Sequence, residues 1–206
     1  MTQLRDFDAA AATWDEEPRR VQLSGEIAAA IRSSIQISPA WHAMDFGCGT
    51  GLVTLRLAPH LAGITGVDSS QKMLEQLELK RQQLGLTSVQ TLLASALPGS
   101  EPTAQFNLIT SAMTLHHIED PAPLLGLFFR LLLPGGRIAL ADLETEDGHF
   151  HDDPTGVFHH GFSSHQLTEL LEGAGFYDVS VKRITEIPKG ERRYPVLLAT
   201  AAVPGS

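Results

Sequence analysis

Short apolar runs alternate with helical patterns from position 40 onward, and this alternation constrains the fold more than any other feature. Neighbouring parallel strands need a crossover connection, which is usually a helix. Strands that alternate with helices therefore predict a mainly parallel sheet with helices on both faces. The apolar runs are interpreted as strands over 41–46, 64–67, 89–93, 106–111, 137–141, 177–184 and 196–201.

Helices are predicted from apolar spacing and from residues that favour helix ends. Asp120 before Pro121 is typical of a helix start, and Ser163 with Gln166 has the spacing of a capping box. The short segment 187–190 joins the last two strands, which are therefore expected to pair as a hairpin. The predicted fold is an α/β, Rossmann-like, mostly parallel seven-stranded sheet with helices on both faces and an antiparallel edge hairpin. The predicted helices cover 23–35, 52–58, 70–84, 121–133 and 164–174.

The length of 206 residues favours one main domain, and the hydrophobic fraction of 43% is ample for one packed core. We expect an N-terminal helical segment over 1–38 and a ligand-binding domain over 39–206. No stretch approaches the roughly 20 apolar residues that cross a bilayer, and the first residues lack the pattern of a signal peptide. The lone Cys48 excludes an internal disulfide and fits a reducing compartment. A cytoplasmic location is therefore expected.

The net charge of −9 at pH 7 makes a nucleic-acid partner unfavourable, because phosphate backbones attract fields of Lys and Arg. The one basic stretch, 189–193, is short and contains an acid, so we interpret it as a solvated turn. Composition points to a small or otherwise non-polyanionic substrate, with no nucleic-acid or membrane partner. A monomer or a homodimer is expected.

A glycine-rich turn, Gly47-Cys48-Gly49-Thr50-Gly51, joins the first predicted strand of the sheet to the following helix. Ligands of open α/β sheets bind at the carboxyl ends of strands, and glycines allow a ligand to approach the backbone closely. Asp68 ends the next predicted strand, where an acid accepts hydrogen bonds from a ribose diol. Taken separately, the turn is also explained as a tight strand–helix connection and Asp68 as a helix cap. Together they favour a ligand that contains ribose.

The spacing of the turn also separates classes of cofactor. A dinucleotide fingerprint has glycine at its sixth position, where this sequence has Leu52. No phosphate-binding loop of the type G-x-x-x-x-G-K-[ST] is present, and no lysine lies close to the turn. A ligand without phosphates therefore fits best.

Residues 40–142 resemble the class I S-adenosylmethionine-dependent methyltransferases, in particular the small bacterial type related to ubiquinone/menaquinone-biosynthesis methyltransferases. The resemblance implies an enzyme that transfers a methyl group from S-adenosyl-L-methionine to a small-molecule acceptor that the sequence does not identify. The alternatives are a non-catalytic or regulatory S-adenosylmethionine-binding protein and, disfavoured by Leu52, a nucleotide-dependent oxidoreductase. The matching motifs are 44–51, 66–70 with 73–74, 106–109, 115–118 and 133–137.

The resemblance also assigns a cofactor site. This sequence departs from the family pattern at Ser95, where the family commonly has an acid. The adenine would therefore be held without a charge-assisted hydrogen bond. Asn107 likewise replaces the more usual Asp of the fourth strand. The expected cofactor-binding residues are Asp45, Gly47, Cys48, Gly49, Gly51, Asp68, Ser69, Met73, Ser95 and Ala96.

His116 and His117 follow the fourth predicted strand and are the candidate catalytic residues. A sulfonium makes its methyl group electrophilic, so the protein mainly has to position the acceptor. A general base is needed only when the acceptor loses a proton. We favour His116 over His117 for that role, and a purely structural histidine pair is the alternative.

Histidines and acids are dense over 148–153, with His159, His160 and His165 beyond. Such residues bind zinc or iron, but no C-x-x-C or H-E-x-x-H scaffold is present. We therefore predict a loop that lines the acceptor pocket, and no metal. The predicted acceptor-binding residues are Trp14, His151 and His160. By resemblance, Phe7 and Arg19 or Arg20 form a lid with Trp14; simple packing of the first helix is the alternative.

Overall fold

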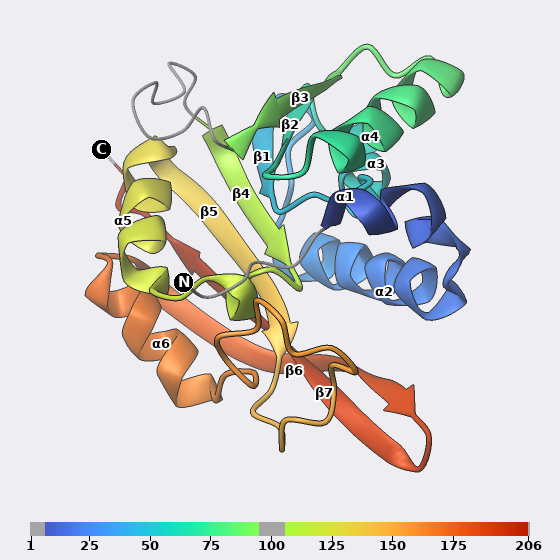
Figure 1. Cartoon of the computed structure of the whole chain (residues 1–206). Helices are drawn as coiled ribbons and strands as arrows, with labels where there is room; N and C mark the ends of the chain where they lie inside the picture. Colours follow the sequence, from blue (N-terminus) through green and yellow to red (C-terminus); the bar gives the residue numbers. More distant parts are fainter. Residues whose placement is uncertain (1–6, 95–105, 206) are drawn as a thin grey trace.

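The computed structural model describes residues 7–94 and 106–205, and its centre is one seven-stranded sheet. The strand order is β3-β2-β1-β4-β5-β7-β6, which confirms the predicted sheet (Figure 1). The strands are β1 His42–Phe46, β2 Gly63–Asp68, β3 Val89–Leu93, β4 Phe106–Ala112, β5 Leu132–Leu143, β6 Tyr177–Lys189 and β7 Arg192–Ala202.

Strand pairing places one reversal of the winding in the middle of the sheet. β1 pairs in parallel with both β2 and β4, β2 pairs in parallel with β3, and β4 with β5. β7 is antiparallel to β5 and β6, so the last two strands form the expected hairpin at one edge. The chain winds in opposite directions on the two sides of the β1/β4 pair, and ligands bind at such switch points.

The helices form two layers, one on each face of the sheet (Figure 1). α2, α3 and α4 cover one face, and α5 and α6 cover the other. Ile31 and Leu77 are fully buried on the first side, and Leu125 and Phe128 on the second. The helices are α1 Phe7–Ala10, α2 Pro18–Ser34, α3 Thr54–Leu57, α4 Gln71–Gln83, α5 Pro121–Leu131 and α6 Ser164–Gly173, with 3₁₀ turns η1 Ala11–Glu16, η2 Ala58–His60 and η4 Leu115–His117.

Capping residues begin three helices where the sequence indicates. The Asp120 carboxylate accepts a hydrogen bond from the Ala122 backbone N–H, and Pro121 is the first helical residue of α5. Ser163 and Gln166 form the reciprocal capping box of α6. The Ser70 hydroxyl caps α4 by accepting a hydrogen bond from the Met73 backbone N–H. These side chains satisfy backbone donors that a helix leaves unpaired at its N-terminus.

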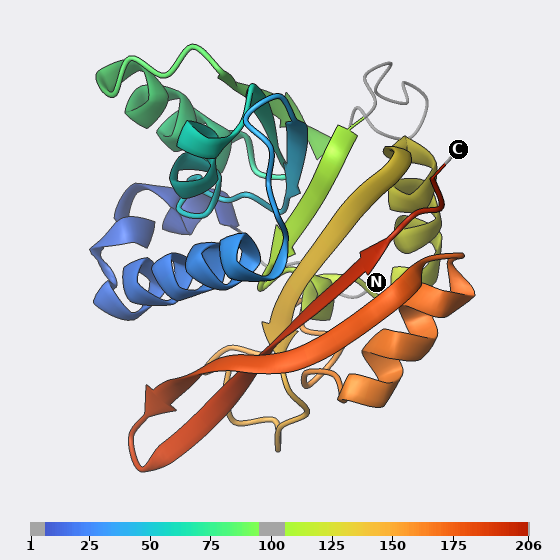
Figure 2. The ribbon, with the colours of Figure 1, turned by 180° about the vertical axis from the view of Figure 1, so that it is seen from behind.

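The hairpin turn was predicted wrongly at 187–190. β6 continues to Lys189 and β7 begins at Arg192, because Ile187 pairs with Tyr194 and both side chains are buried. The hairpin therefore extends well beyond the end of the sheet (Figure 2). Pro188 is tolerated since β6 is an edge strand, where a missing ladder donor costs little.

The fifth strand begins earlier than the predicted residue 137. β5 starts at Leu132, so Pro134, Gly135 and Gly136 lie inside the strand. The pairing of β5 with β4 shifts register between Phe106 and Leu108.

Among the described residues, no helix is long and apolar enough to cross a membrane.

Candidate functional site

The glycine turn follows β1 directly and lies at the β1/β4 switch point. The backbone N–H groups of Gly47 and Cys48 donate to the carbonyl oxygen of Val67 at 2.8 and 3.1 Å, which ties the turn to β2. Gly47, Gly49 and Gly51 have φ angles of 70°, 53° and 83°. This left-handed region favours glycine.

Two of the three glycines are required by packing, and one faces open space. A Cβ atom at Gly47 would lie 2.2 Å from Thr114 Oγ1, and one at Gly51 would lie 2.3 Å from Leu77 Cδ1. A Cβ atom at Gly49 would meet no atom closer than a methionine sulfur at 4.0 Å. Gly49 is therefore the position in the turn where a ligand can come closest to the backbone.

Asp68, at the end of β2, lies against the same turn. Its carboxylate accepts hydrogen bonds from the backbone N–H of Gly49 at 2.7 Å and of Ser70 at 2.9 Å. Burial raises the pKa of Asp68, while these backbone donors oppose that rise. The carboxylate thus fixes the turn from one side and lines the cavity described below.

Asp45 lies beneath the turn and is almost fully buried. One carboxylate oxygen accepts a hydrogen bond from the Thr54 hydroxyl at 2.5 Å, and the other accepts one from the Thr110 hydroxyl at 2.8 Å. Burial raises the pKa of Asp45 to about 6, and the two hydroxyl groups lower it in part. Asp45 therefore braces β1 against α3 and β4.

A cavity of about 810 Å³ opens beside the turn. Small-molecule sites commonly span about 300–1,000 Å³, so the space suits a cofactor with a second small molecule. Cys48, Ser69 and Met73 line it, as predicted for the cofactor end, whereas Gly51 is not among its lining residues. Further walls come from η4, the N-terminal segment 7–17, α2, the end of β6, and the loop of residues 144–163, named here the β5–α6 loop.

His116, which lines the cavity, forms a buried pair with Asp142 behind it. The His116 Nδ1 atom lies 2.6 Å from Asp142 Oδ1, and both side chains are 1% exposed. The backbone N–H of His116 donates to Asp142 Oδ2, and that of Leu143 donates to Asp142 Oδ1. A carboxylate acceptor at Nδ1 selects the tautomer with its proton there. Among the described residues, nothing hydrogen-bonds the buried Nε2 atom of His116.

The β5–α6 loop closes over this histidine. The backbone N–H groups of Phe158 and His159 donate to the carbonyl oxygen of His116 at 3.0 and 3.2 Å. The ring of His151, which lines the cavity, lies 4.9 Å from the His116 ring, and the His117 ring lies 4.2 Å from it. The predicted His116, His117 and His151 are therefore brought together.

His117 lines the cavity beside His116, whereas His160 lies outside the cavity lining. The Nδ1 atom of His117 lies 2.7 Å from the carbonyl oxygen of Gly156, and its ring packs edge-on against Phe7. His160 lies on the β5–α6 loop, with its Nδ1 atom 3.3 Å from Glu146 Oε1 and a half-exposed side chain. It is not among the residues that line the cavity.

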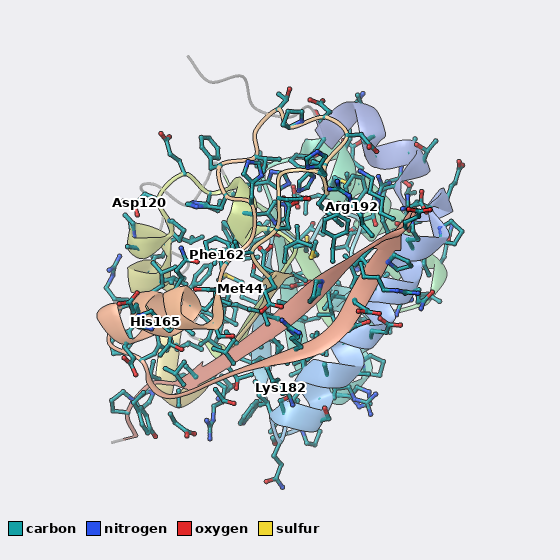
Figure 3. All side chains as sticks on the ribbon, turned by 90° about the horizontal axis from the view of Figure 1, so that it is seen from below. Met44, Asp120, Phe162, His165, Lys182 and Arg192 are labelled. Carbon is teal, nitrogen blue, oxygen red and sulfur yellow. The ribbon has the colours of Figure 1, made fainter. Side chains whose placement is uncertain are left out.

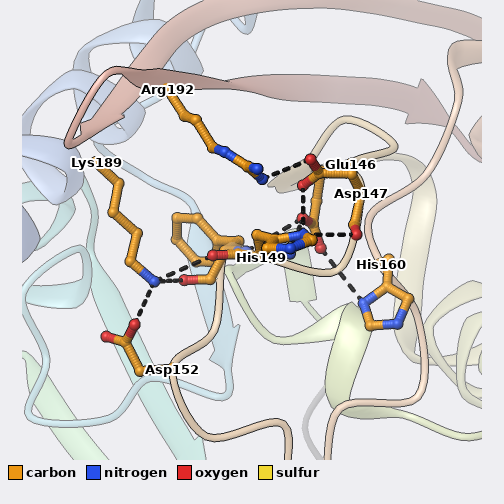
Figure 4. Close-up of polar contacts among 8 residues, drawn as sticks. Glu146, Asp147, His149, Asp152, His160, Lys189 and Arg192 are labelled. Carbon is orange, nitrogen blue, oxygen red and sulfur yellow. Dashed lines mark hydrogen bonds and ion pairs between the residues drawn. The ribbon is translucent and has the colours of Figure 1, made fainter.

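One lysine of the hairpin fastens the β5–α6 loop (Figure 4). Lys189 Nζ donates to the carbonyl oxygens of His149 and Phe150 at 3.1 and 2.7 Å, and to the Asp152 carboxylate at 2.7 Å. Arg192, near the far end of the hairpin (Figure 3), pairs with Asp147. The basic stretch interpreted as a solvated turn thus positions part of the cavity wall.

The N-terminal segment 7–17 is fastened to the cofactor end by two carboxylates. Asp8 accepts hydrogen bonds from the Ser70 hydroxyl and the Lys72 backbone N–H, and these lower the pKa of Asp8. Asp15 accepts one from the Thr50 hydroxyl of the glycine turn at 2.5 Å. Phe7 and Trp14 of this segment line the cavity together with Arg19 and Arg20 of α2, where the sequence predicted a lid.

Two predicted site residues lie outside the described part of the chain, and three residues of the site were not predicted. Ser95 and Ala96 lie outside the described residues. Within 7–94 and 106–205, no group of three or more His, Cys, Asp or Glu side chains is placed to hold a metal ion. Asp142, Lys189 and Asp15 were missed; only Asp142, at the end of an apolar run, carried a signal in the sequence.

The fold and the site together define a Rossmann-like protein with a cavity at the switch point of its sheet, where ligands of such sheets bind. Residues 44–140 match the family described as "Methyltransferase domain". Together with the relatives described below, this match supports a class I S-adenosylmethionine-dependent methyltransferase.

Two relatives and one solved structure illustrate the likeness. An uncharacterised methyltransferase of Schizosaccharomyces pombe is 31% identical over 153 residues, 67% of this chain and 54% of that protein. A ubiquinone biosynthesis O-methyltransferase of Methylococcus capsulatus is 35% identical over 102 residues, 49% of this chain and 43% of that protein. The chain spans about half the length of these relatives.

A solved phosphoethanolamine N-methyltransferase 2 of Haemonchus contortus, in complex with S-adenosyl-L-methionine, has the same fold. It superposes with a TM-score of 0.71 at 17% identity, over 87% of this chain and 52% of that chain. The cofactor of this family is S-adenosyl-L-methionine. The residues here fit that group, because the open side of Gly49 leaves room for it and Asp68 provides an acid at the end of β2.

Proposed function

We propose that this chain transfers a methyl group from S-adenosyl-L-methionine to a small-molecule acceptor, with His116 as the general base. The observation that carries the proposal is the buried pair of His116 with Asp142, because His116 lines the same cavity as Gly49 and Asp68. A cofactor at the glycine turn and an acceptor at the histidine would share one cavity. That arrangement serves a direct transfer between them.

When bound, the cofactor supplies an activated methyl group on a positively charged sulfur. The chain's own residues then have to hold the acceptor and take its proton. Asp142 keeps the Nδ1 proton of His116 in place, so the Nε2 lone pair is the one available to accept a proton. The imidazolium formed in this way would be stabilised by the adjacent carboxylate.

Different residues are assigned to the cofactor and to the acceptor. Asp68 would accept hydrogen bonds from the ribose hydroxyls, and the backbone of Gly49 would face the methionine part. Cys48, Ser69 and Met73 complete that end, and Ser95 with Ala96 remains a prediction for the adenine. Asp45 is proposed to act from beneath the turn, through Thr54 and Thr110, rather than by direct contact.

Acceptor contacts are proposed at Trp14 and His151, with His117 beside the base. His160 is retained only as a residue that supports the loop through Glu146. The Methylococcus capsulatus relative is named an O-methyltransferase, which agrees with a base next to the acceptor. A cytoplasmic location, and a monomer or homodimer without a nucleic-acid or membrane partner, remain proposals.

Titration calorimetry tests the cofactor half of the proposal. Wild-type protein is expected to bind S-adenosyl-L-methionine and S-adenosylhomocysteine but not NAD(H). Asp68→Ala should weaken binding by about 1–3 kcal/mol, because charge-assisted hydrogen bonds are lost. Asp68→Asn, which keeps one acceptor oxygen for the turn, separates loss of the charge from loss of the turn's support. NAD(H) binding without S-adenosyl-L-methionine binding would overturn the assignment.

The catalytic half is tested with His116→Gln. The amide can still donate to Asp142, so the fold and cofactor affinity should be kept while turnover falls by about 10²–10⁴-fold. Turnover is measured as S-adenosylhomocysteine formed during incubation with candidate acceptors. Wild-type turnover in the variant would remove His116 as the base. Cofactor binding with no transfer to any acceptor would instead favour a non-catalytic binding protein.

A further inference from the structure

Outside the glycine turn, the cavity is lined by a set of apolar and aromatic side chains that stand beside charged and histidine side chains of the same elements. They come from the N-terminal segment, α2, the end of η4, the β5–α6 loop and the hairpin. Such walls favour a ligand that loses little by leaving water, since apolar surface gains about 25 cal/mol for each Å² removed from water. The residues are Phe7, Trp14, Leu23, Ile118, Phe150 and Ile187.

Two cations that line the same walls already have carboxylate partners. Arg19 Nε lies 3.1 Å from Glu17 Oε1, and Lys189 Nζ lies 2.7 Å from Asp152 Oδ1. All four residues line the cavity. A charged acceptor would have to compete with these pairs and to lose its own hydration, which is costly in an apolar site.

Trp14 offers an aromatic face, but an arginine of the chain already occupies it. The Arg20 guanidinium carbon lies 3.8 Å above the centre of the Trp14 ring, and Arg20 Nη1 donates to the Trp14 carbonyl oxygen at 3.2 Å. Faces of this kind bind ammonium groups when they are open. This face therefore does not select for a cationic acceptor.

One hydrogen-bonding group at this end, His116 Nε2, is buried and has no hydrogen-bond partner among the described residues. With Nδ1 held by Asp142, Nε2 is an acceptor. A buried acceptor left unsatisfied costs free energy, and a hydroxyl donor on the bound molecule would remove that cost.

We infer that the acceptor is an uncharged, largely apolar molecule, flat enough to pack against these rings, whose methylated atom is a weakly acidic hydroxyl oxygen. This inference rests on the proposed function. On transfer, the hydroxyl proton moves to His116 Nε2, and a lone pair of the oxygen forms the bond to the methyl carbon. The electrons of the broken carbon–sulfur bond stay on the sulfur, whose positive charge is thereby removed.

A matched series of naphthalenes tests the charge preference by titration into wild-type protein saturated with S-adenosylhomocysteine. 2-Naphthol should bind at least about tenfold more tightly than 2-naphthoate or 2-(aminomethyl)naphthalene, because only the last two carry a charge into the apolar walls. Equal or tighter binding of either charged compound would overturn the inference.

A second measurement removes one wall charge. Asp152→Asn leaves Lys189 without its carboxylate, so affinity for 2-naphthoate relative to 2-naphthol should rise by about two- to fivefold. Glu169→Gln, which breaks an exposed pair with His165 on α6, is the matched control and should leave the ratio unchanged. An unchanged ratio in Asp152→Asn would contradict the role given to the paired charges.

The hydroxyl is tested by comparing 2-naphthol with 2-methoxynaphthalene. Wild-type protein should favour 2-naphthol by about fivefold, the effect of one hydrogen bond, and His116→Gln should reduce this preference. Equal affinities in wild type would overturn the hydroxyl assignment even if the variant does not fold. Failure of S-adenosylhomocysteine to bind would instead defeat the proposed function, so the two failures are distinguishable.

Discussion

At the scale of single residues, two glycines of the turn are expected to have different roles, Gly51 in stability and Gly49 in binding. Gly51→Ala combines a left-handed backbone with a clash against Leu77, so it should lower the free energy of unfolding by about 2–5 kcal/mol. Gly49→Ala meets no such clash. It should lower the free energy of unfolding by only about 1–2 kcal/mol, the cost of a left-handed backbone at alanine. Chemical denaturation followed by circular dichroism measures both.

For cofactor affinity, we expect the opposite ranking of these two variants. Gly49 lines the cavity, so the added methyl group of Gly49→Ala intrudes where the cofactor is proposed to lie. Calorimetry with S-adenosylhomocysteine should show a larger loss of affinity for Gly49→Ala than for folded Gly51→Ala. The reverse order would mean that the ligand approaches another part of the turn.

Asp45 provides a prediction on pH. Its pKa is about 6 in the folded protein, against an ordinary value of 3.8, so the folded state binds the proton more tightly. The resulting stabilisation is fully present below pH 3.8 and is lost as the pH rises through 6. The loss amounts to about 3 kcal/mol, at about 1.4 kcal/mol for each unit of pKa shift.

Asp45→Asn removes this titration and keeps hydrogen-bonding groups for Thr54 and Thr110. Its stability relative to wild type should therefore improve as the pH rises from about 4 to 6 and then level off. Urea denaturation at several pH values gives the difference. A difference that is constant with pH would show that the Asp45 carboxyl does not titrate in this range.

Residue patterns predicted the parts of the site that depend on local chemistry. Gly47, Gly49 and Asp68 follow strand ends, and strand ends meet at one edge of a parallel sheet, so their proximity follows from the sequence. The partner of His116 did not follow, because Asp142 lies 26 positions away and is brought close only by the pairing of β4 with β5. The division of roles among the three glycines depends on Thr114 and Leu77, which no turn pattern specifies.

At the scale of elements, the hairpin positions the β5–α6 loop through Lys189. Lys189→Met removes three hydrogen bonds to residues 149–152, so amide hydrogen exchange there should become roughly tenfold faster or more. Mass spectrometry of the exchanged peptides measures this. Lys189→Arg, which keeps the charge, should restore part of the protection.

Exchange in α5 and in β1 is the internal control for this experiment and should not change. Unchanged exchange over 149–152 in Lys189→Met would mean that Glu146, which accepts hydrogen bonds from the backbone N–H groups of His149 and Phe150, holds the loop without the lysine.

Element boundaries show where local signals were sufficient. The helix starts at Pro121 and Ser164 were predicted because the capping residue directly precedes each of them in the sequence. The hairpin was predicted too short because its outer part is stabilised by distant packing: Tyr194 lies 5.2 Å, ring to ring, from Phe150 of the β5–α6 loop. A polar-looking stretch with Pro188 gave no local sign of that contact.

At the scale of the whole molecule, the cavity is assembled from segments that are far apart in the sequence. The sheet and the turn after β1 supply the cofactor end, and segments 7–17 and 144–163 supply much of the remaining wall. The boundary expected between 1–38 and 39–206 stays a prediction. Ile27 and Ile31 of α2 belong to the same core as Ala43 and Leu108 of the sheet, so α2 packs as part of the central layer arrangement.

Removing the N-terminal segment tests how far it contributes to binding rather than to folding. In residues 7–16 only Ala11 is buried, and Glu17, whose side chain caps α2, is kept when the chain begins there. The shortened chain should therefore lose less than about 2 kcal/mol of stability. Its affinity for S-adenosylhomocysteine should fall about tenfold, equal to ~1.4 kcal/mol, because Phe7 and Trp14 no longer cover the cavity.

The full-length variant Asp8→Asn/Asp15→Asn is the matched comparison, because it weakens the attachment of the segment without removing its aromatic side chains. The segment is attached at Ser70 and Thr50, both close to the cofactor end, so weaker attachment should appear mainly as faster release of S-adenosylhomocysteine. Stopped-flow fluorescence of the two tryptophans measures that rate. Wild-type affinity and release in both proteins would show that residues 7–16 cover the cavity without taking part in holding the cofactor.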